Sequence, residues 1–487
     1  MPHVDVPQSI CLGAVARRDI TPPVGMYHRM WGAATHDRST GVHRPLLATA
    51  LALAPQSSAS ANDAKKSAQV VVGIDHCLLW DAEMDALRAA VSERTGLSRD
   101  QVQISMSHTH AAGLLDTERA ALPGGQMIAE YLVGLAEAII QAVREALEAL
   151  RPVSIVYGTG RCALATHRDF WDAENKLFAC GFNPTAAADD TLLVARVTDA
   201  ESRVVATVVN YACHPTTLAW DNTLVSPDYV GALRELVEAA TDAPCLFLQG
   251  ASGDLGPRHG FVGDVAVADR NGRELGYATL AALEPLPEAG VRYQYLGPVV
   301  SGATIGTWGY QPLEKESLEG NAVWDCQTFA VPLPYRPDLP TREQTEIELT
   351  RWQQQERACL AEGNADGARE CRAQIERMTR QLTRLSALPP GPTVPLSVTL
   401  WQLGDALWVF VQGEHYSLLQ QALRKQFPAH PILVATVTNG WRPGYVPTAD
   451  TYGRGIYQEA IAQVAAGSLE AVIAAVARRI ESLLGSE

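Results

Sequence analysis

The segments LLATALAL (residues 46–53) and QVVVGI (residues 69–74) are short apolar runs of the kind that form buried strands. The polar stretch 55–67 between them predicts the loop at the tip of a hairpin. Residues 80–96 follow with helical periodicity and a closing glycine, and residues 102–110, VQISMSHTH, predict a strand that runs into a loop. The first part of the chain therefore alternates strands with helices.

The same alternation continues toward the middle of the chain. A helix with a strong apolar stripe is expected over about 126–149, and another helix over 229–241. Further strands are predicted at 153–160, 192–199, 204–214 and 245–254. This order of elements favours an α/β (α+β) fold in which a large mixed β-sheet is flanked by helices.

Residues 341–387 differ from the rest because they are polar, charged and helical in pattern, with a break at EGNADG (362–367). They predict an antiparallel helical hairpin, which is either a solvated excursion or a contact in a homo-oligomer. Strand patterns return at 394–414 and 432–440, and a helix is expected over about 455–484.

The composition is that of an ordinary globular protein. The chain has 487 residues, of which 47% are hydrophobic, and its net charge is −15. Because this charge repels phosphate backbones, we expect no nucleic-acid partner. Without an internal repeat or a low-complexity linker, the chain is expected to form one domain over residues 1–487, with the hairpin as an insertion.

Cysteine usage and the N-terminal sequence bear on the compartment. The nine cysteines are scattered and include no Cys-x-x-Cys pair, which argues against a disulfide framework and against a thiolate zinc finger. The N-terminus lacks the basic start and apolar core of a signal peptide. No apolar run approaches the roughly 20 residues of a membrane span. We therefore expect a cytoplasmic protein without a transmembrane segment.

Four segments place metal-type side chains where predicted strands end. In SHTHAAG, His108 and His110 are two positions apart, so on an extended chain both imidazoles point the same way. His214 in NYACHPTT and Glu414 in VFVQGEHY each follow an apolar run. A Gly/Pro-rich loop over 439–458 holds three tyrosines, at positions 445, 452 and 457. Since zinc commonly takes imidazole and carboxylate ligands, these positions are candidates for a metal site.

Each candidate also has a structural interpretation. His108 and His110 are as typical of surface histidines in a polar loop as of metal ligands. A histidine at a strand end, such as His214, is more often structural than a ligand. Glu414 is either solvent-facing or functional. The tyrosines either pack their loop, or ligate zinc or donate to a developing oxyanion.

Six segments in a fixed order connect these candidates. They are ARRDITPP with GVHRPLLATAL (16–23 and 41–51), SHTHAAG (107–113), NYACHPTT (210–217), QGASGDLGP (249–257), QGEHYS (412–417) and GYVPTADTYGRGIYQ (444–458). In this order they resemble the catalytic domain of the neutral/alkaline (non-lysosomal) ceramidases, over nearly the whole chain. The resemblance implies the fold of that family and the activity of a metal-dependent hydrolase.

The resemblance also implies roles for individual residues. It implies a Zn²⁺ ion held by His108, His214, Glu414 and Tyr445. It places His110 beside the metal as an acid/base or orienting group, Arg168 as a group that positions the substrate carbonyl, and Tyr457 as a further active-site tyrosine. Zinc lowers the pKa of bound water to about 7, so a zinc-bound hydroxide would attack an amide or ester carbonyl and His110 would protonate the leaving amine.

Several departures from the family pattern concern the substrate. The family carries a serine where this chain has Gly250, and Ser252 lies two residues further on. Asp254 in the same loop is either a partner of a ligand histidine or a turn-forming residue. The C-terminal β-sandwich domain and the secretion signal of the family are also not found in this sequence. These departures favour a substrate that is smaller or more polar than ceramide.

The favoured function is therefore a zinc-dependent hydrolase acting on a small-molecule or lipid-like N-acyl or ester substrate. One alternative is a true ceramide amidohydrolase, and another is a non-catalytic ligand-binding scaffold that keeps the metal site. An amidohydrolase barrel is disfavoured because about a hundred residues precede the His-x-His pair. Trp308, Trp324 and Trp441 either line an apolar pocket or pack in the core.

Overall fold

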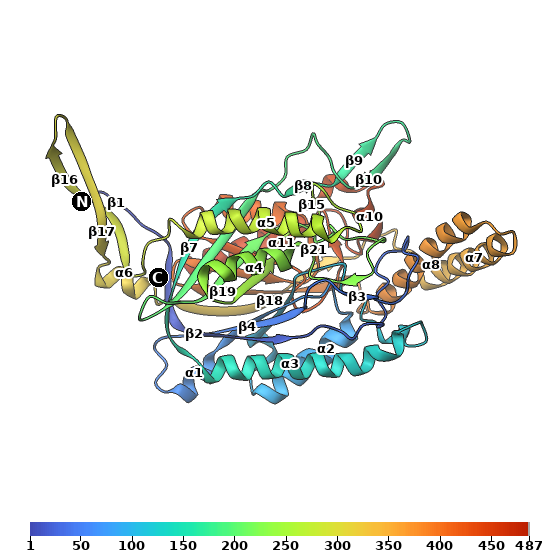
Figure 1. Ribbon diagram of the computed structural model, residues 1–487, viewed down its shortest axis with the longest axis horizontal. Helices are drawn as coiled ribbons and strands as arrows, with labels where there is room; N and C mark the ends of the chain where they lie inside the picture. The colour runs from blue at the N-terminus through green and yellow to red at the C-terminus, as the bar shows by residue number, and fades with distance from the viewer. Residues whose placement is uncertain (486–487) are drawn as a thin grey trace.

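The computed structural model describes residues 1–485, and its centre is a pair of β-sheets packed face to face (Figure 1). The larger sheet has eight strands in the order β14–β12–β11–β7–β2–β4–β5–β6. Their bounds are β2 (Gln8–Asp19), β4 (Leu47–Ala54), β5 (Gln69–Ile74), β6 (Val102–Met106), β7 (Arg151–Arg161), β11 (Thr191–Asp199), β12 (Val204–Tyr211) and β14 (Cys245–Gln249). The edge pairs β5–β6 and β12–β14 are parallel and the inner pairs antiparallel, so the sheet is mixed as predicted.

The smaller sheet has four strands in the order β18–β19–β20–β22. They are β18 (Trp324–Pro334), β19 (Thr393–Leu403), β20 (Ala406–Val411) and β22 (Ile432–Ala435). Its inner face carries Trp401, Trp408 and Phe410, which belong to the same buried cluster as Leu51 and Val71 of the larger sheet. The two sheets are therefore held together by a core of large apolar side chains.

Strand β4 shows how one strand serves two layers. Ala48 and Ala50 pack in one cluster with helix α3 (Ile128–Glu148), whereas Leu51 and Leu53 join the core between the sheets. Successive side chains of a strand point to opposite faces, and here small residues alternate with large ones. The small face leaves room for the helix, and the large face fills the space between the sheets.

Helices complete four layers, in the order helix, sheet, sheet, helix. The outer face of the larger sheet is covered by α3 with α2 (Asp81–Thr95), α4 (Tyr229–Thr241) and α5 (Val265–Leu283). The outer face of the smaller sheet is covered by α9 (Leu418–Gln426) and α11 (Ser468–Leu484). Among the described residues, only Gly125–Glu148 has the length and composition of a membrane-spanning helix, and this stretch lies against β2 and β4.

Three pairs of elements project from this core (Figure 1). They are the arm of β16 (Val291–Val300) and β17 (Thr304–Pro312), the ribbon of β9 (Asp169–Asp172) and β10 (Leu177–Cys180), and the hairpin of α7 (Arg342–Ala361) and α8 (Ala365–Ser386). The remaining short elements are β1 (His3–Val4), β3 (Gly41–Val42), α1 (Ala61–Ser67), β8 (Ala165–His167), β13 (Leu224–Val225), β15 (Leu255–Pro257), α6 (Lys315–Gly320), β21 (Glu414–His415), β23 (Tyr445–Val446) and α10 (Tyr457–Ile461).

Three local predictions differ from the structure. The predicted loop 55–67 contains α1, because the Ser60 side chain accepts from the backbone N–H of Asp63 and starts a helix. The predicted strand 432–440 stops at Ala435. The predicted C-terminal helix is interrupted between α10 and α11, and Gly467 at the start of α11 has a left-handed backbone.

Candidate metal centre

Three buried ligand atoms meet at one end of the two sheets. His108 Nε2 lies 3.1 Å from His214 Nε2 and 3.2 Å from Glu414 Oε2, and His214 Nε2 lies 3.3 Å from the same carboxylate oxygen. Four ligands at about 2.0–2.1 Å in a tetrahedron lie about 3.3 Å from one another. The three side chains therefore have a spacing compatible with a tetrahedral metal ion, and they form a group that could hold one.

The ends of separate strands bring these ligands together. His108 follows β6 with a backbone φ of +68°, and His214 follows β12 just before Pro215. Glu414 lies in β21, which pairs in parallel with β23 so that Glu414 is opposite Tyr445. Because each ligand lies at or just after the end of a strand, the sheets fix the spacing of the site.

Contacts on the far side of each ligand fix its orientation. His108 Nδ1 donates to the Cys77 carbonyl oxygen at 2.6 Å, and His214 Nδ1 donates to the Ser252 carbonyl oxygen at 3.2 Å. The indole N–H of Trp441 donates to Glu414 Oε1. When Nδ1 carries the proton, Nε2 keeps its lone pair, so these contacts leave both Nε2 atoms ready to ligate.

Electrostatics favours the ligating form of two of these groups. Burial raises the pKa of Glu414, but the charge of His108 and hydrogen bonds to the carboxylate outweigh it and lower this pKa to about 2. Burial and Arg168 lower the pKa of His214 well below its ordinary value. For His108, burial lowers the pKa, but Cys77 and Glu414 raise it well above the ordinary value. A proton therefore competes with a cation for His108.

Tyr445 and Arg168 extend the site as a pair. The Tyr445 hydroxyl lies 3.5 Å from His214 Nε2 and accepts from Arg168 Nη2 at 2.9 Å. Arg168 also donates to the Gly253 carbonyl oxygen at 3.1 and 2.7 Å. Tyr445 is among the residues that line the cavity beside the ligands, whereas Arg168 lies behind it. Arg168 thus contacts the site through Tyr445, and the positioning role that the resemblance implies for it stays a prediction.

His110 and Tyr457 lie at the edge of the ligand set. The ring of His110 is 5.1 Å from that of His108 and 5.3 Å from that of His214, and its Nε2 is buried without a hydrogen-bond partner in the described structure. The ring of Tyr457 is 5.8 Å from that of Tyr445, and its side chain is half exposed. Both residues line the cavity, so the structure brings them to the predicted ligands.

The residues of the loop 250–254 contact neighbouring segments of the chain. A Cβ atom at Gly250 would lie 2.9 Å from both Ala212 Cβ and Gln420 Oε1, so this position faces packed side chains. The Ser252 hydroxyl accepts from Gln249 at 2.7 Å. Asp254 accepts from the backbone N–H and the hydroxyl of Ser417 at 2.6 and 2.7 Å, and so fixes the segment after Glu414. Of the two interpretations of Asp254, these contacts do not include a ligand histidine; the Ser252 carbonyl holds His214 instead.

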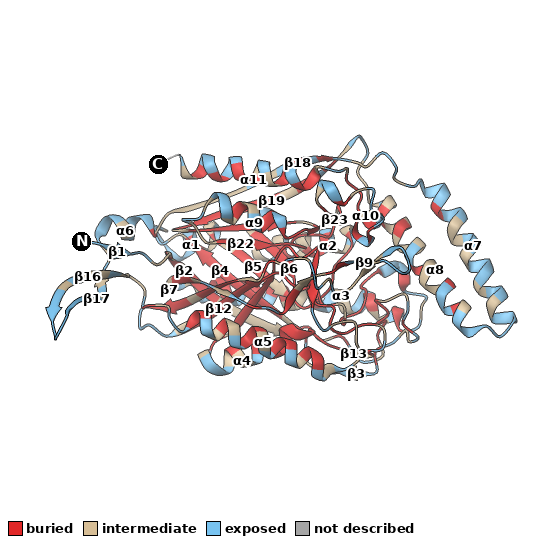
Figure 2. Ribbon diagram, turned by 90° about the horizontal axis from the view of Figure 1, so that it is seen from above, coloured by how far each residue is buried: buried red, intermediate tan, exposed pale blue. Residues whose placement is uncertain are grey.

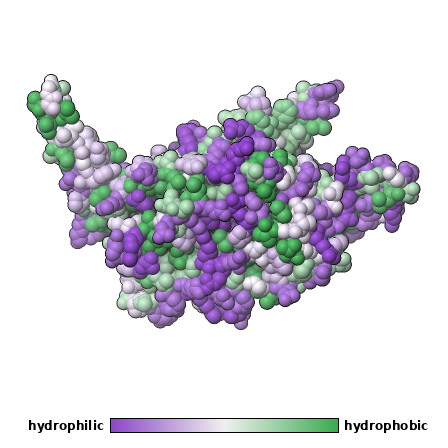
Figure 3. All heavy atoms as spheres, viewed as in Figure 1, coloured by the Kyte–Doolittle hydropathy of each residue, from purple (hydrophilic) through white to green (hydrophobic). Residues whose placement is uncertain are grey.

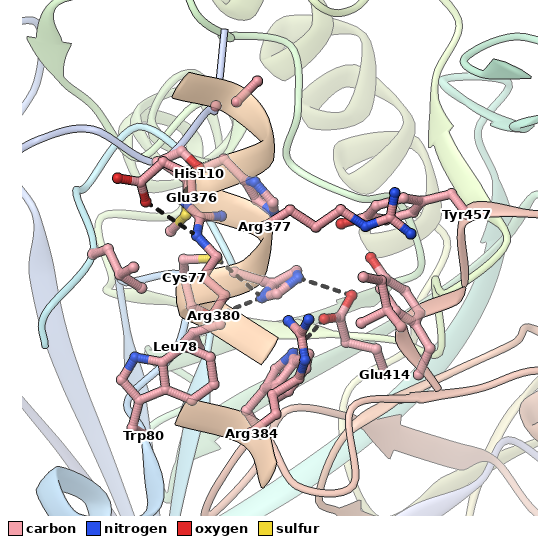
Figure 4. A pocket seen from close by; sticks show the side chains of 18 residues that line it. Cys77, Leu78, Trp80, His110, Glu376, Arg377, Arg380, Arg384, Glu414 and Tyr457 are labelled. Atoms are coloured by element: carbon pink, nitrogen blue, oxygen red, sulfur yellow. Dashed lines mark hydrogen bonds and ion pairs between the residues drawn. The ribbon is translucent and has the colours of Figure 1, made fainter. Parts of the chain in front are cut away.

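A cavity of about 190 Å³ opens beside the ligands (Figure 4). Its walls include apolar side chains from several elements, namely Met30, Leu78, Trp80, Leu114, Trp441 and Ile461. One wall is helix α8, which contributes Glu376, Arg377, Arg380 and Arg384. Of the three tryptophans considered from sequence, Trp441 lines this cavity, Trp324 packs against the core between the sheets, and Trp308 lies on the projecting arm.

Helix α8 corrects the interpretation of the hairpin. Arg119 and Glu376 form a buried ion pair at 2.9 Å, and Arg380 donates to the Met30 carbonyl oxygen at 2.6 Å. The prediction of a solvated excursion is therefore wrong for α8, although it describes α7, whose surface is mostly exposed (Figure 2). The sequence signal for α8 is the spacing of Arg377, Arg380 and Arg384 at i, i+3 and i+7, which places them on one face of a helix.

Comparison with known proteins decides the family. The family model described as neutral/alkaline non-lysosomal ceramidase, N-terminal, matches residues 12–258, just over half of the 487 residues. The chain belongs to this ceramidase family. The match includes His108, His110, Arg168 and His214, and Glu414 lies beyond it.

Solved structures agree with the ceramidase fold. The neutral ceramidase from Pseudomonas aeruginosa is similar with a TM-score of 0.61 at 15% identity, over 97% of this chain and 74% of that chain. A ceramidase complexed with C2 is similar with a TM-score of 0.63 at 14% identity and the same coverage. No curated protein matches the sequence. The chain is thus a ceramidase-family hydrolase, and its site is consistent with amide hydrolysis.

Proposed function

We propose that this chain is a zinc-dependent hydrolase that cleaves an amide bond. The observation that carries the proposal is the triangle of His108 Nε2, His214 Nε2 and Glu414 Oε2, whose sides of 3.1, 3.2 and 3.3 Å match the ligand spacing of tetrahedral zinc. The Tyr445 hydroxyl, 3.5 Å from His214 Nε2, supplies a fourth candidate ligand atom. When bound, zinc would supply Lewis acidity toward a carbonyl and lower the pKa of a water to about 7.

His110 is the residue we assign to proton transfer. It lines the cavity, its ring lies next to both ligand imidazoles, and its Nε2 has no hydrogen-bond partner among the described residues. A free imidazole nitrogen beside the reacting atoms can take a proton from water and give it to the leaving amine. The neighbouring ring of Trp31, at 5.1 Å, holds the imidazole in place.

Tyr457 and the Arg168–Tyr445 pair complete the proposed machinery. The half-exposed Tyr457 phenol lines the cavity and can donate to the oxygen that becomes negative as the carbonyl is attacked. Arg168 acts as a positioning residue, because its 2.9 Å hydrogen bond to Tyr445 and its contacts to Gly253 hold the phenol against the ligands.

The proposed substrate is an N-acyl compound whose acyl chain lies on the apolar wall of the cavity. Met30, Leu78, Trp80 and Leu114 provide this wall. Gly250 no longer argues against ceramide, because position 250 faces Ala212 and Gln420. Ceramide and smaller N-acyl amides therefore both belong in the test of substrates.

Metal analysis with a panel of substrates tests the proposal. The protein is expressed with zinc, and turnover is measured for short-chain ceramide, N-acyl amides and esters that share one acyl chain. We expect about one zinc per chain, loss of turnover on treatment with a chelator, and recovery when zinc is restored. A zinc-loaded protein that binds these compounds and cleaves none of them would replace this proposal with the ligand-binding scaffold.

A further inference from the structure

Three arginines of α8 face the ligands across the cavity. Arg377, Arg380 and Arg384 line it on one side, and Glu414 and Tyr457 line it on the other (Figure 4). Arg384 is buried, whereas Arg377 stands at the exposed mouth. The cavity thus brings three guanidinium groups close to the position where a substrate carbonyl would lie.

These guanidinium groups have few anionic partners within residues 1–485. Arg377 forms no hydrogen bond or ion pair there. Arg384 donates only to Gln381 of its own helix, at 3.1 and 2.7 Å, and its guanidinium carbon lies 5.9 Å from the centre of the Trp441 ring. The Nε atom of Arg380 is buried without a hydrogen-bond partner, and its nearest carboxylate is Glu376 at 3.9 Å.

The two carboxylates of the cavity are shared with other partners and compensate these charges only in part. Glu376 is already bound by Arg119 at 2.9 Å and is also close to Arg372 at 3.5 Å. Glu414 is a proposed metal ligand and is held by Trp441. Three arginines therefore face two carboxylates that have other partners, and a metal dication would add further positive charge.

A buried cation without a partner is costly, so such a group implies an anion that arrives from outside. Burial lowers the pKa of Arg384 to about 10, so the group still carries its charge at neutral pH. The planar guanidinium binds carboxylate, sulfonate and phosphate oxygens through paired hydrogen bonds. The arrangement thus suits an anionic group on the same molecule that carries the amide.

We propose that the substrate of this hydrolase carries an anionic group, which Arg377, Arg380 and Arg384 bind while the amide lies against His108, His214 and Glu414. This inference rests on the proposed hydrolase function. The α8 arginines set the choice of substrate, and the apolar wall holds the acyl chain. Ceramide, which is neutral, would lack the group that these arginines recognise.

Matched substrates test this inference with the zinc-loaded enzyme. N-lauroylglycine and N-lauroylglycinamide differ in one carboxylate, and N-lauroyltaurine replaces the carboxylate with a sulfonate. Because hydrogen bonds to charged groups are the stronger ones, we expect kcat/KM to be about 10- to 100-fold higher for the anionic amides than for glycinamide. The ratio between glycine and taurine compounds distinguishes a carboxylate from a larger oxyanion.

Variants of α8 assign the preference to the arginines. Arg377→Gln should raise KM about tenfold for N-lauroylglycine and change KM for N-lauroylglycinamide much less. Arg384→Gln tests the buried end of the cluster in the same way. Arg369→Gln is the matched control, because Arg369 is exposed on the same helix and pairs with Asp366 outside the cavity. Equal use of the charged and neutral amides, unaffected by Arg377→Gln, would overturn the inference.

A binding measurement separates this inference from the proposed function. Trp80 and Trp441 line the cavity, so their fluorescence reports binding without turnover. If no amide is cleaved but N-lauroylglycine binds more tightly than the glycinamide, and Arg377→Gln removes the difference, the anion site stands and the hydrolase proposal fails. If amides are cleaved but N-lauroylglycine and N-lauroylglycinamide bind equally well, the hydrolase proposal stands and the anion-site inference fails.

Discussion

His108 and His110 differ in what holds their ring nitrogens. His108 Nδ1 donates to a backbone carbonyl, so its Nε2 faces His214 and Glu414, whereas His110 Nε2 has no partner among the described residues. We expect His108→Ala to lose zinc, and His110→Ala to keep zinc while kcat/KM falls about 10²- to 10⁴-fold. Elemental analysis and turnover of one amide measure both effects. A His110→Ala protein that lacks zinc would contradict this division of roles.

At Gly250, where the family has a serine, neighbouring side chains are packed too closely for a larger residue. A side chain there would press on Ala212 and Gln420, with contacts of 2.9 Å. We expect Gly250→Ser to lower the free energy of unfolding by about 1–3 kcal/mol, as is typical of overpacking, without a gain of ceramide turnover. Urea unfolding measures the change, and Gly181→Ser is the control because a Cβ at Gly181 has no neighbour within 4 Å. A stable variant with new ceramide turnover would restore the functional interpretation of this position.

At the scale of the element, helix α8 depends on the ion pair between Glu376 and Arg119. Both side chains are buried, and the residues are 257 positions apart in the chain. Removing one partner of a buried pair leaves the other charge uncompensated, so Glu376→Gln should lower the free energy of unfolding by about 3–5 kcal/mol. Urea unfolding at pH 7 measures this, with the exposed Glu343→Gln on α7 as control.

The same pair predicts a pH dependence. Burial raises the pKa of Glu376, but Arg119 and Arg380 outweigh it and hold this pKa below the ordinary value of 4.5. An acid whose pKa is lowered on folding contributes stability above its unfolded pKa, and the contribution is lost as the pH falls through the folded value. The stability difference between wild type and Glu376→Gln should therefore be full at pH 7 and shrink below about pH 4.5. A difference that stays constant down to pH 3 would show that Glu376 acts by packing alone.

Some features of the fold and site could be predicted from the sequence because their signals lie within a short segment of the chain. His108, His214 and Glu414 each follow an apolar strand, and functional side chains concentrate in the loops that follow strands, so the sequence alone could single them out as candidates. The sequence of α8 places its arginines on one helix face but does not show what that face packs against, because the partner Arg119 lies in a distant segment. The packing that excludes a side chain at Gly250 likewise involves Gln420, which only the fold brings close.

At the scale of the whole molecule, the β16–β17 arm and the α7–α8 hairpin project from opposite ends (Figure 1). The arm carries exposed apolar side chains, which gather at its tip in Figure 3. They include Leu296, Val299, Val300 and Ile305. None of the arm's residues lines the cavity, so the site and the arm are expected to be separable.

Trimming the arm tests this separation. Pro298 pairs with Gly306 in the antiparallel register, so residues 299–305 can be replaced by an Asn-Gly turn that keeps the strands aligned. We expect the trimmed protein to bind zinc as the wild type does and to keep kcat/KM within about twofold, because the four layers that position the ligands are untouched. Elemental analysis and turnover of the same amide measure this. A large loss of turnover with zinc retained would mean that the arm takes part in presenting the substrate, and the cavity beside α8 would then be only part of the binding surface.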